Sequence, residues 1–261
     1  MRSVGIYPPR IGGLIPSYTG KGESEGCWIN NAQSYNGWRD RRKRTMPRID
    51  DYKKAFEIAK GELEKVNPKR IADQSGASII YDKEGNVRLR IVFLNREVEL
   101  EWTSFGFSFV DGKEEIPIQQ QVLILHYLMG CPGSKVEGQW VAYQEIPDGR
   151  FYMDAFVRRA KEPLVKTFGG NPEALVTVAQ ELYAAKPFDH GDISVVVQAL
   201  PKIPVALILW KGDDEFPPEG SILFDRSIQE ILSAEDIAWL AGMVVYPLVG
   251  RAAKKVLSAH G

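Results

Sequence analysis

The chain has 261 residues, of which 44% are apolar and 26% are charged, a composition that is ordinary for a protein with a core of its own. Its net charge of −1 is unevenly distributed, because residues 1–45 carry +5 and the remaining residues carry −6. An acidic body lacks the basic surface on which nucleic-acid binding depends, so we expect no nucleic-acid partner for residues 46–261.

Residues 1–45 are rich in Gly, Pro, Ser and Asn and end in a basic cluster, Trp38–Arg44. They show no sustained hydrophobic period, and prolines and glycines interrupt any signal-peptide core, so we interpret them as an N-terminal extension. Two alternatives are a basic arm for an anionic partner and a translation start at Met46. The two cysteines, Cys27 and Cys131, share no motif spacing, which favours a reducing, cytoplasmic setting.

Residues 46–261 are expected to form a single α+β domain. A helical period begins near Pro47, and Asn67-Pro68 ends that helix. Between Ala77 and Val110 the apolar period changes to two, which predicts an antiparallel meander of three or four strands. A further helix begins at Pro117 and stops at the glycines and proline of residues 130–133.

The second half begins with two helical regions, residues 151–168 and a helix that follows Asn171-Pro172. The apolar segments 193–200 and 205–210 are joined by a link too short for a parallel crossover, so they should pair antiparallel. Ser233 and Asp236 resemble a capping box at the start of the last helix. Its apolar run of 14 residues is too short for a membrane span. The fold prediction is α+β, with an antiparallel meander plus a second antiparallel strand pair, packed with four to six helices.

Several short motifs in the last third carry a resemblance to a known family. They are Gly191-Asp192, Pro201-x-x-Pro204, Trp210-x-Gly212-Asp213-x-Glu215-Phe216, Leu223-Phe224-Asp225 and Glu235-Asp236. With these motifs the chain resembles an uncharacterised prokaryotic family, domain of unknown function 3786, over about residues 50–255.

The resemblance implies a setting of anaerobic redox or corrinoid-type metabolism, with an iron–sulfur or corrinoid protein as partner. Members often carry an iron–sulfur label, because some have a cysteine-rich cluster domain at the N-terminus. This chain departs from that pattern, since residues 1–45 contain one cysteine and a cluster normally needs four thiolates. We therefore expect no iron–sulfur cluster held by this chain alone, and the cofactor stays unknown.

An acidic segment follows the predicted strand 205–210. Its carboxylates, Asp213, Asp214 and Glu215, together with Asp192 and Asp225, are oxygen ligands of the kind that Mg²⁺ or Ca²⁺ prefers. In a catalytic interpretation Asp213 and His190 take part directly, with His190 as the base. The alternative interpretation is a polar turn, in which the carboxylates accept hydrogen bonds from backbone N–H groups.

Aromatic residues are the candidates for cofactor binding. Trp140, Trp210 and Phe216 are predicted to line a site for a flat ligand such as a tetrapyrrole, although core packing is the alternative use of such side chains. No GxGxxG, Walker loop, GxSxG or HExxH motif occurs in the sequence.

Three functions follow from these patterns and from the family resemblance, which alone implies the metabolic setting of the first. The first is an accessory domain that binds a ligand or partner in anaerobic redox or corrinoid-type metabolism and is not catalytic by itself. The second is a metal-dependent enzyme that uses the carboxylate cluster with a histidine base. The third is an interaction protein whose last helix packs on another subunit through Trp239, Met243 and Tyr246.

Overall fold

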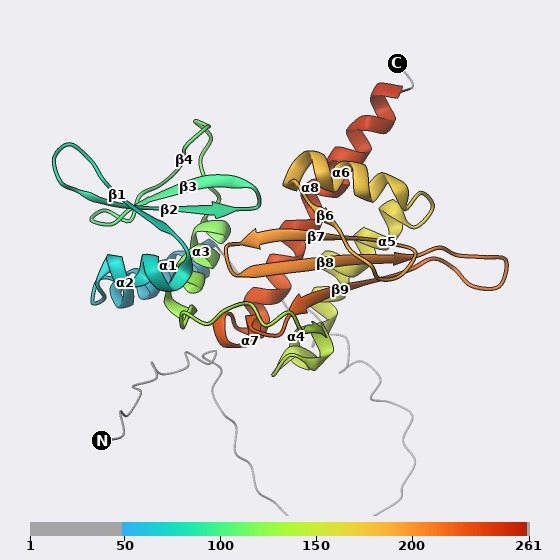
Figure 1. The fold of residues 1–261 in the computed structure, drawn as a ribbon, viewed down its shortest axis with the longest axis horizontal. Coiled ribbons are helices and arrows are strands. Elements are labelled where there is room, and N and C mark those ends of the chain that lie inside the picture. The colour runs from blue at the N-terminus through green and yellow to red at the C-terminus, as the bar shows by residue number, and fades with distance from the viewer. Residues whose placement is uncertain (1–48, 260–261) are drawn as a thin grey trace, which may run out of the picture. The chain divides into compact units, whose positions relative to one another are not determined.

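A computed structural model describes residues 49–259 of the chain (Figure 1). These residues belong to a unit that runs from Pro47 to Gly261, and the predicted α+β class is confirmed. The predicted extension, residues 1–45, lies outside the described residues, as does the alternative start at Met46. Two separate antiparallel sheets organise the described part, and we call them sheet A and sheet B.

The first helix, α1 (Ile49–Leu63), ends close to its predicted end, but a second helix, α2 (Pro68–Ser75), follows at once. Asn67 caps α2, because its side-chain oxygen accepts a hydrogen bond of 2.8 Å from the backbone N–H of Lys69. Proline is tolerated in a first helical turn, where its missing N–H would have no partner in the helix. The Asn-Pro pair predicted to end the first helix therefore begins the second, and α1 ends four residues before Asn67, at Leu63.

Sheet A confirms the predicted meander. Its strands lie in chain order and are β1 (Ser78–Tyr81), β2 (Val87–Phe93), β3 (Arg96–Glu101) and β4 (Phe107–Phe109). The inner face carries buried apolar side chains that share one core with α1 and with α3 (Ile118–Gly130). The outer face is charged, and Arg90 and Glu99 pair across it at 2.7 Å. The alternation of apolar and charged residues in the sequence predicts this arrangement, with one buried apolar face and one solvent-exposed charged face.

Sheet B is wider than the strand pair that the sequence indicates. In spatial order it contains β5 (Trp140–Ala142), β9 (Glu219–Asp225), β8 (Ile203–Trp210), β7 (Ile193–Leu200) and β6 (Lys186–Pro187). The predicted antiparallel pairing of the two apolar segments is confirmed, with Val197 opposite Val205. The segment that follows the acidic residues adds β9 beside β8, and two short strands complete the edges.

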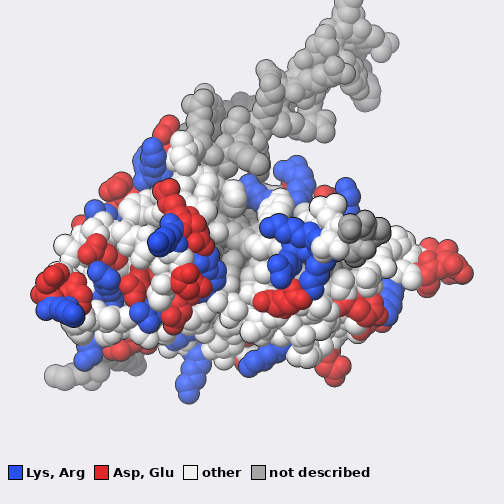
Figure 2. Space-filling model, turned by 90° about the horizontal axis from the view of Figure 1, so that it is seen from above, with Lys and Arg blue, Asp and Glu red and all other residues white. Residues whose placement is uncertain are grey.

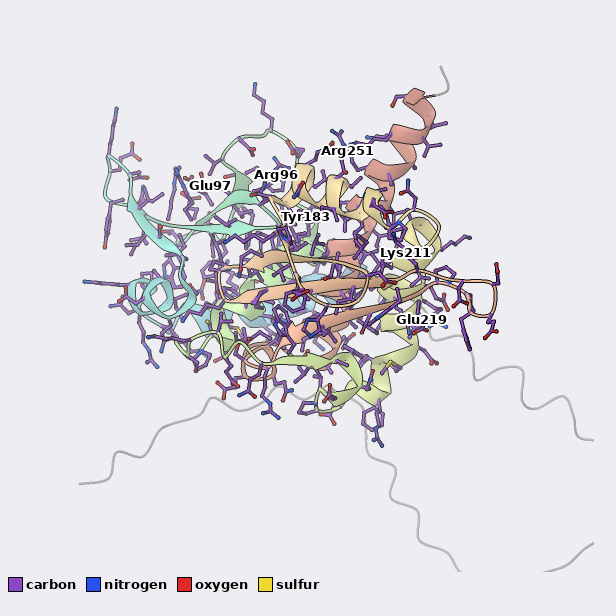
Figure 3. The ribbon with its side chains drawn as sticks, turned by 45° about the vertical axis from the view of Figure 1, so that its right-hand side comes forward. Arg96, Glu97, Tyr183, Lys211, Glu219 and Arg251 are labelled. Atoms are coloured by element: carbon purple, nitrogen blue, oxygen red, sulfur yellow. The ribbon has the colours of Figure 1, made fainter. Side chains whose placement is uncertain are left out.

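The second half is mostly helical apart from sheet B. Its helical segments are η1 (Tyr143–Glu145), α4 (Gly149–Phe156), the π-helical turn η2 (Val157–Lys161), α5 (Glu162–Phe168), α6 (Glu173–Tyr183), α7 (Ile228–Ile231) and α8 (Ala234–Ala259). Helix α8 passes behind sheet B in Figure 1. Tyr183, at the end of α6, donates a hydrogen bond of 2.9 Å to the carbonyl of Val244 on α8 (Figure 3).

At the start of α8 the predicted pairing of Ser233 with Asp236 is present, with a hydroxyl–carboxylate hydrogen bond where a full capping box has a backbone one. The Ser233 hydroxyl donates to the Asp236 carboxylate at 2.7 Å and accepts from the Asp236 backbone N–H at 3.2 Å. Although α8 is the longest helix described, no helix between residues 49 and 259 has the length and apolar character that crossing a membrane requires.

Candidate functional site

The acidic residues 213–215 lie at the tip of the β8–β9 hairpin, which projects beyond the sheet in Figure 1 and forms the acidic end on the right in Figure 2. One carboxylate oxygen of Asp213 accepts hydrogen bonds from the backbone N–H groups of Glu215, at 2.9 Å, and Phe216, at 2.7 Å. These backbone hydrogen bonds hold the pKa of Asp213 below its ordinary value. Asp213 therefore stabilises the turn, as the alternative interpretation of this segment describes.

The other two predicted carboxylates lie at opposite ends of the strands. Asp192, just before β7, accepts a hydrogen bond of 2.7 Å from the backbone N–H of Lys211, and its own N–H donates to the Leu209 carbonyl at 3.1 Å. Lys211 and Glu219 mark the base of the acidic hairpin in Figure 3. Asp192 is thus close to the hairpin base, and it fixes the end of β8.

Asp225 is buried at the far end of β9, and both of its carboxylate oxygens accept hydrogen bonds. Its carboxylate accepts from the backbone N–H groups of Glu137, at 3.0 Å, and Gly138, at 2.6 Å. It also accepts from the Ser227 hydroxyl at 2.6 Å and the Ser227 N–H at 3.1 Å. Burial alone would raise the pKa of Asp225, but these hydrogen bonds outweigh burial and lower it.

The five carboxylates therefore do not meet. A strand of seven residues separates Asp225 from the hairpin, and at roughly 3.3 Å per residue this is a distance of about 20 Å. Within residues 49–259 no group of three or more His, Cys, Asp and Glu side chains is placed to hold a metal ion. The metal and catalytic roles of Asp192, Asp213, Asp214, Glu215 and Asp225 stay predictions, without a shared geometry behind them.

The structure links the predicted histidine, through one further ring, to Trp140, which is one of the cofactor candidates. The ring of His190 stacks on Phe188, with centroids 4.6 Å apart and an angle of 12° between the planes. Phe188 in turn contacts Trp140 of β5, with centroids 5.0 Å apart. The three rings form a continuous group, which we call the aromatic ladder.

Strand pairing shows which face of sheet B this group covers. The inner face of β8 carries Leu207 and Leu209, which belong to the main core. Ala206 and Ile208 point to the outer face and are equally buried, although they are not part of that core. The loop of residues 188–192 explains the burial of Ile208, because a Cβ added at Gly191 would lie only 2.6 Å from its side chain.

The loop is held in place by Ser194. Its hydroxyl donates to the Phe188 carbonyl at 2.7 Å and accepts from the His190 backbone N–H at 3.2 Å. Gly191 has a φ of 64°, a conformation that suits glycine, and the space beside it is also taken by the Trp210 ring. Three predicted site residues, Trp140, His190 and Trp210, therefore lie along the outer face of sheet B, with Trp140 and Trp210 opposite the two ends of β9.

The rings on the outer face of sheet B are partly exposed to solvent, so they do not form a second hydrophobic core. His190 is exposed and Trp210 keeps 40% of its surface accessible, whereas Trp140 and Phe188 are half-buried. Phe216 does not join the group; it lies on the hairpin tip and is 67% exposed. The sequence analysis missed Phe188, although its place two residues before His190 was a usable signal, because rings at i and i+2 can lie on one side of an extended segment.

The predicted subunit-binding face of α8 is partly covered by the domain itself. The Trp239 ring contacts Tyr52 of α1 and lies under the guanidinium of Arg159, while Tyr246 is 54% exposed. Trp239 therefore packs within the described chain. A role for Tyr246 in contacting another subunit stays a prediction.

Comparison with known proteins bears on the family alone. A model of the family described as domain of unknown function (DUF3786) matches residues 67–246, which confirms the resemblance drawn from the motifs. No curated protein and no solved structure matches the chain.

Proposed function

The chain belongs to the DUF3786 family, and we propose that its domain binds a planar ring ligand on the outer face of sheet B and is not catalytic by itself. The proposal includes a reducing, cytoplasmic setting in anaerobic redox or corrinoid-type metabolism. There the domain acts as an accessory protein, and its partner is an iron–sulfur or corrinoid protein. This metabolic setting rests on the family resemblance.

The observation that carries the proposal is the aromatic ladder. Trp140, Phe188 and His190 form a row of rings that a loop holds over an already complete sheet, next to the partly exposed Trp210. Flat ligands bind such rings by stacking, which contributes roughly 1–3 kcal/mol per ring. An exposed imidazole adds a hydrogen-bonding group, or an axial ligand for a metal at the centre of a bound ring.

The carboxylates support a binding role over catalysis. Asp213, Asp192 and Asp225 each accept hydrogen bonds from backbone N–H groups near their own strand ends. Carboxylates engaged in this way hold turns and strand ends in place, and their lone pairs are directed at the backbone rather than at one shared point.

The experiment is a binding titration of the full chain with a panel of corrinoids and haems, followed by absorbance and calorimetry. We expect at least one member to bind, with Trp140→Ala and His190→Ala each raising its Kd about tenfold, as the loss of one stacking contact implies. Tyr81→Ala is the matched control, because it removes a 62% exposed aromatic ring from β1 of sheet A.

Two outcomes would overturn the proposal. One is the absence of binding across the whole panel. The other is equal weakening by the sheet A control and the ladder variants, which would mean that the ligand does not recognise the outer face of sheet B.

A further inference from the structure

Arg159 is a half-buried arginine that forms no ion pair with a carboxylate of the described residues. It lies in the π-helical turn η2. By comparison, Arg90, Arg96 and Arg251 each pair with at least one glutamate at 3.2 Å or less. The Arg159 guanidinium instead lies over the ring of Trp239 on α8, 4.0 Å from its centroid.

The local helix geometry positions the Arg159 side chain over the Trp239 ring. A π-helical turn widens the helix by one residue and redirects its side chains, and such turns are frequent at functional sites. Gly242, one turn after Trp239, lies where η2 packs on α8: a Cβ at that position would make ordinary van der Waals contact with Arg159, 3.4 Å from its Cβ and 3.5 Å from its carbonyl oxygen.

Tyr52 supplies a second donor without an acceptor. Its ring meets Trp239 edge-on, with centroids 5.7 Å apart and an angle of 80° between the planes. Its hydroxyl oxygen is buried and has no hydrogen-bond partner within the described chain. Burial raises the pKa of Tyr52 to about 12, so the group stays a neutral O–H donor. A buried donor of this kind destabilises the fold unless something accepts its hydrogen bond.

The surrounding charges limit what that acceptor is. Glu235 lies one helical turn before Trp239, and both it and Arg159 act electrostatically on the Tyr52 hydroxyl. Asp236 is already engaged by His126, at 2.9 Å, and by Ser233. With one unpaired guanidinium and carboxylates nearby, a ligand of a single negative charge fits better than a phosphate dianion. A carboxylate also matches the two-pronged geometry of the guanidinium.

We propose that Arg159 and Tyr52 form a carboxylate-binding site with Trp239 as its floor. The guanidinium donates two parallel N–H bonds to the carboxylate and the phenol O–H donates a third, while the indole excludes water from one side. The site lies on α1, η2 and α8, so it does not depend on the proposed function of the outer face of sheet B.

The test follows the indole N–H signal of Trp239 by NMR in the full chain, assigned with Trp239→Phe. Acetate, benzoate, a peptide with one internal glutamate and blocked ends, and inorganic phosphate are titrated at constant ionic strength. We expect saturable shifts with a carboxylate. Saturation by acetate or benzoate identifies a small-molecule carboxylate, whereas saturation by the peptide alone identifies an acidic side chain of a partner protein; both support the site.

Substitutions test whether binding depends on Arg159 and Tyr52 or only on the loss of a positive charge. Arg159→Gln should weaken binding at least tenfold, and Tyr52→Phe several-fold. Arg158→Gln is the matched control, because it removes an exposed arginine from the same turn and should leave Kd unchanged. Tyr52→Phe leaves the ring in place, so its effect is measurable even if Arg159→Gln does not fold. The site is rejected if phosphate alone shifts the signal, if no carboxylate does, or if Tyr52→Phe binds as the wild type does.

Discussion

Buried tyrosine hydroxyls in this domain differ in one respect that stability measurements can detect. Tyr127, Tyr143 and Tyr183 each donate to a backbone carbonyl, at 2.5, 2.7 and 2.9 Å respectively. The buried Tyr52 hydroxyl has no such acceptor among the described residues. The same substitution, tyrosine to phenylalanine, should therefore have opposite effects at different positions.

In the absence of ligand, we expect Tyr52→Phe to leave the free energy of unfolding unchanged or to raise it by up to about 1 kcal/mol, because an unsatisfied donor is removed. Tyr183→Phe should lower the free energy of unfolding by about 1 kcal/mol, since the Val244 carbonyl loses its donor. Urea unfolding of the two variants beside the wild type measures both. A clear loss of stability in Tyr52→Phe would show that its hydroxyl has an acceptor after all.

Asp225 has a structural role that can be tested in the same way. In Asp225→Ala the buried Ser227 and the N–H groups of Glu137 and Gly138 all lose their acceptor, so we expect a loss of about 3 kcal/mol in the free energy of unfolding. Asp214→Ala, in the exposed hairpin tip, is the control and should change stability little. Equal stability of the two variants would mean that the Asp225 hydrogen bonds contribute nothing net.

Among the elements, the loop of residues 188–192 depends on a single glycine. Gly191 combines a φ of 64° with a position where a Cβ would lie 2.6 Å from Ile208 and 3.0 Å from the Leu209 carbonyl oxygen. We expect Gly191→Ala to lower the free energy of unfolding by about 2–3 kcal/mol and to move the aromatic ladder away from the sheet. Unfolding curves and the NMR signals of the His190 ring measure these effects.

Gly85→Ala is a control that separates backbone strain from crowding. Gly85 has a φ of 85°, but nothing lies within 4 Å of the position that a Cβ would take. Its substitution should cost about 1 kcal/mol, the price of the backbone conformation alone. If both alanine variants lose the same stability, the loop does not press on Ile208 as the coordinates indicate.

The elements that the sequence predicts well are those with a long, regular period. The meander of sheet A, the β7–β8 hairpin and the capped start of α8 are all of this kind. Short edge strands such as β5 and β6 contain too few residues for a period to show. Their pairing depends on segments far away in the chain, which local patterns do not report.

The candidate site illustrates the same limit. Trp140, His190 and Trp210 are recognisable as residues able to bind a ligand, but their position along one face depends on a loop that crosses the outer face of sheet B. The predicted acidic residues do not form one site. Residues 213–215 stay together in a turn, whereas Asp225 lies at the other end of β9. Sequence identifies candidate groups, and only the sheet register decides which of them meet.

At the scale of the whole described domain, the two sheets are joined by a continuous core and by a few polar links. The tip of the β2–β3 hairpin donates from Leu94 to the Ala199 carbonyl at 2.9 Å and from the Asn95 side chain to the Leu182 carbonyl at 3.2 Å. His126 of α3 adds a link to Asp236 of α8, at 2.9 Å. Because the charge of His126 changes with pH, this last link should make the joining of the two halves pH-dependent.

The direction of that dependence follows from the surroundings of His126. Burial alone would lower the pKa of His126, but the hydrogen bond and charge of Asp236, with the charge of Glu235, outweigh burial and raise it. A histidine whose pKa is raised by folding contributes stability that is complete below the unfolded value of about 6.5. That contribution is lost as the pH rises through the raised pKa of the folded state. The pair therefore stabilises the domain in mild acid and less at alkaline pH.

We expect His126→Gln to be less stable than the wild type at pH 5.5, with the difference shrinking by pH 8.5, because only the protonated imidazole forms an ion pair with Asp236. Urea unfolding across this range measures the difference. His190→Gln, which removes an exposed imidazole, is the matched control. Glutamine keeps a donor for Asp236, so the capping of α8 by Ser233 and Asp236 should survive in the variant. A stability difference that stays constant from pH 5.5 to 8.5 would mean that His126 contributes by packing and not by charge, and that the two halves are joined independently of pH.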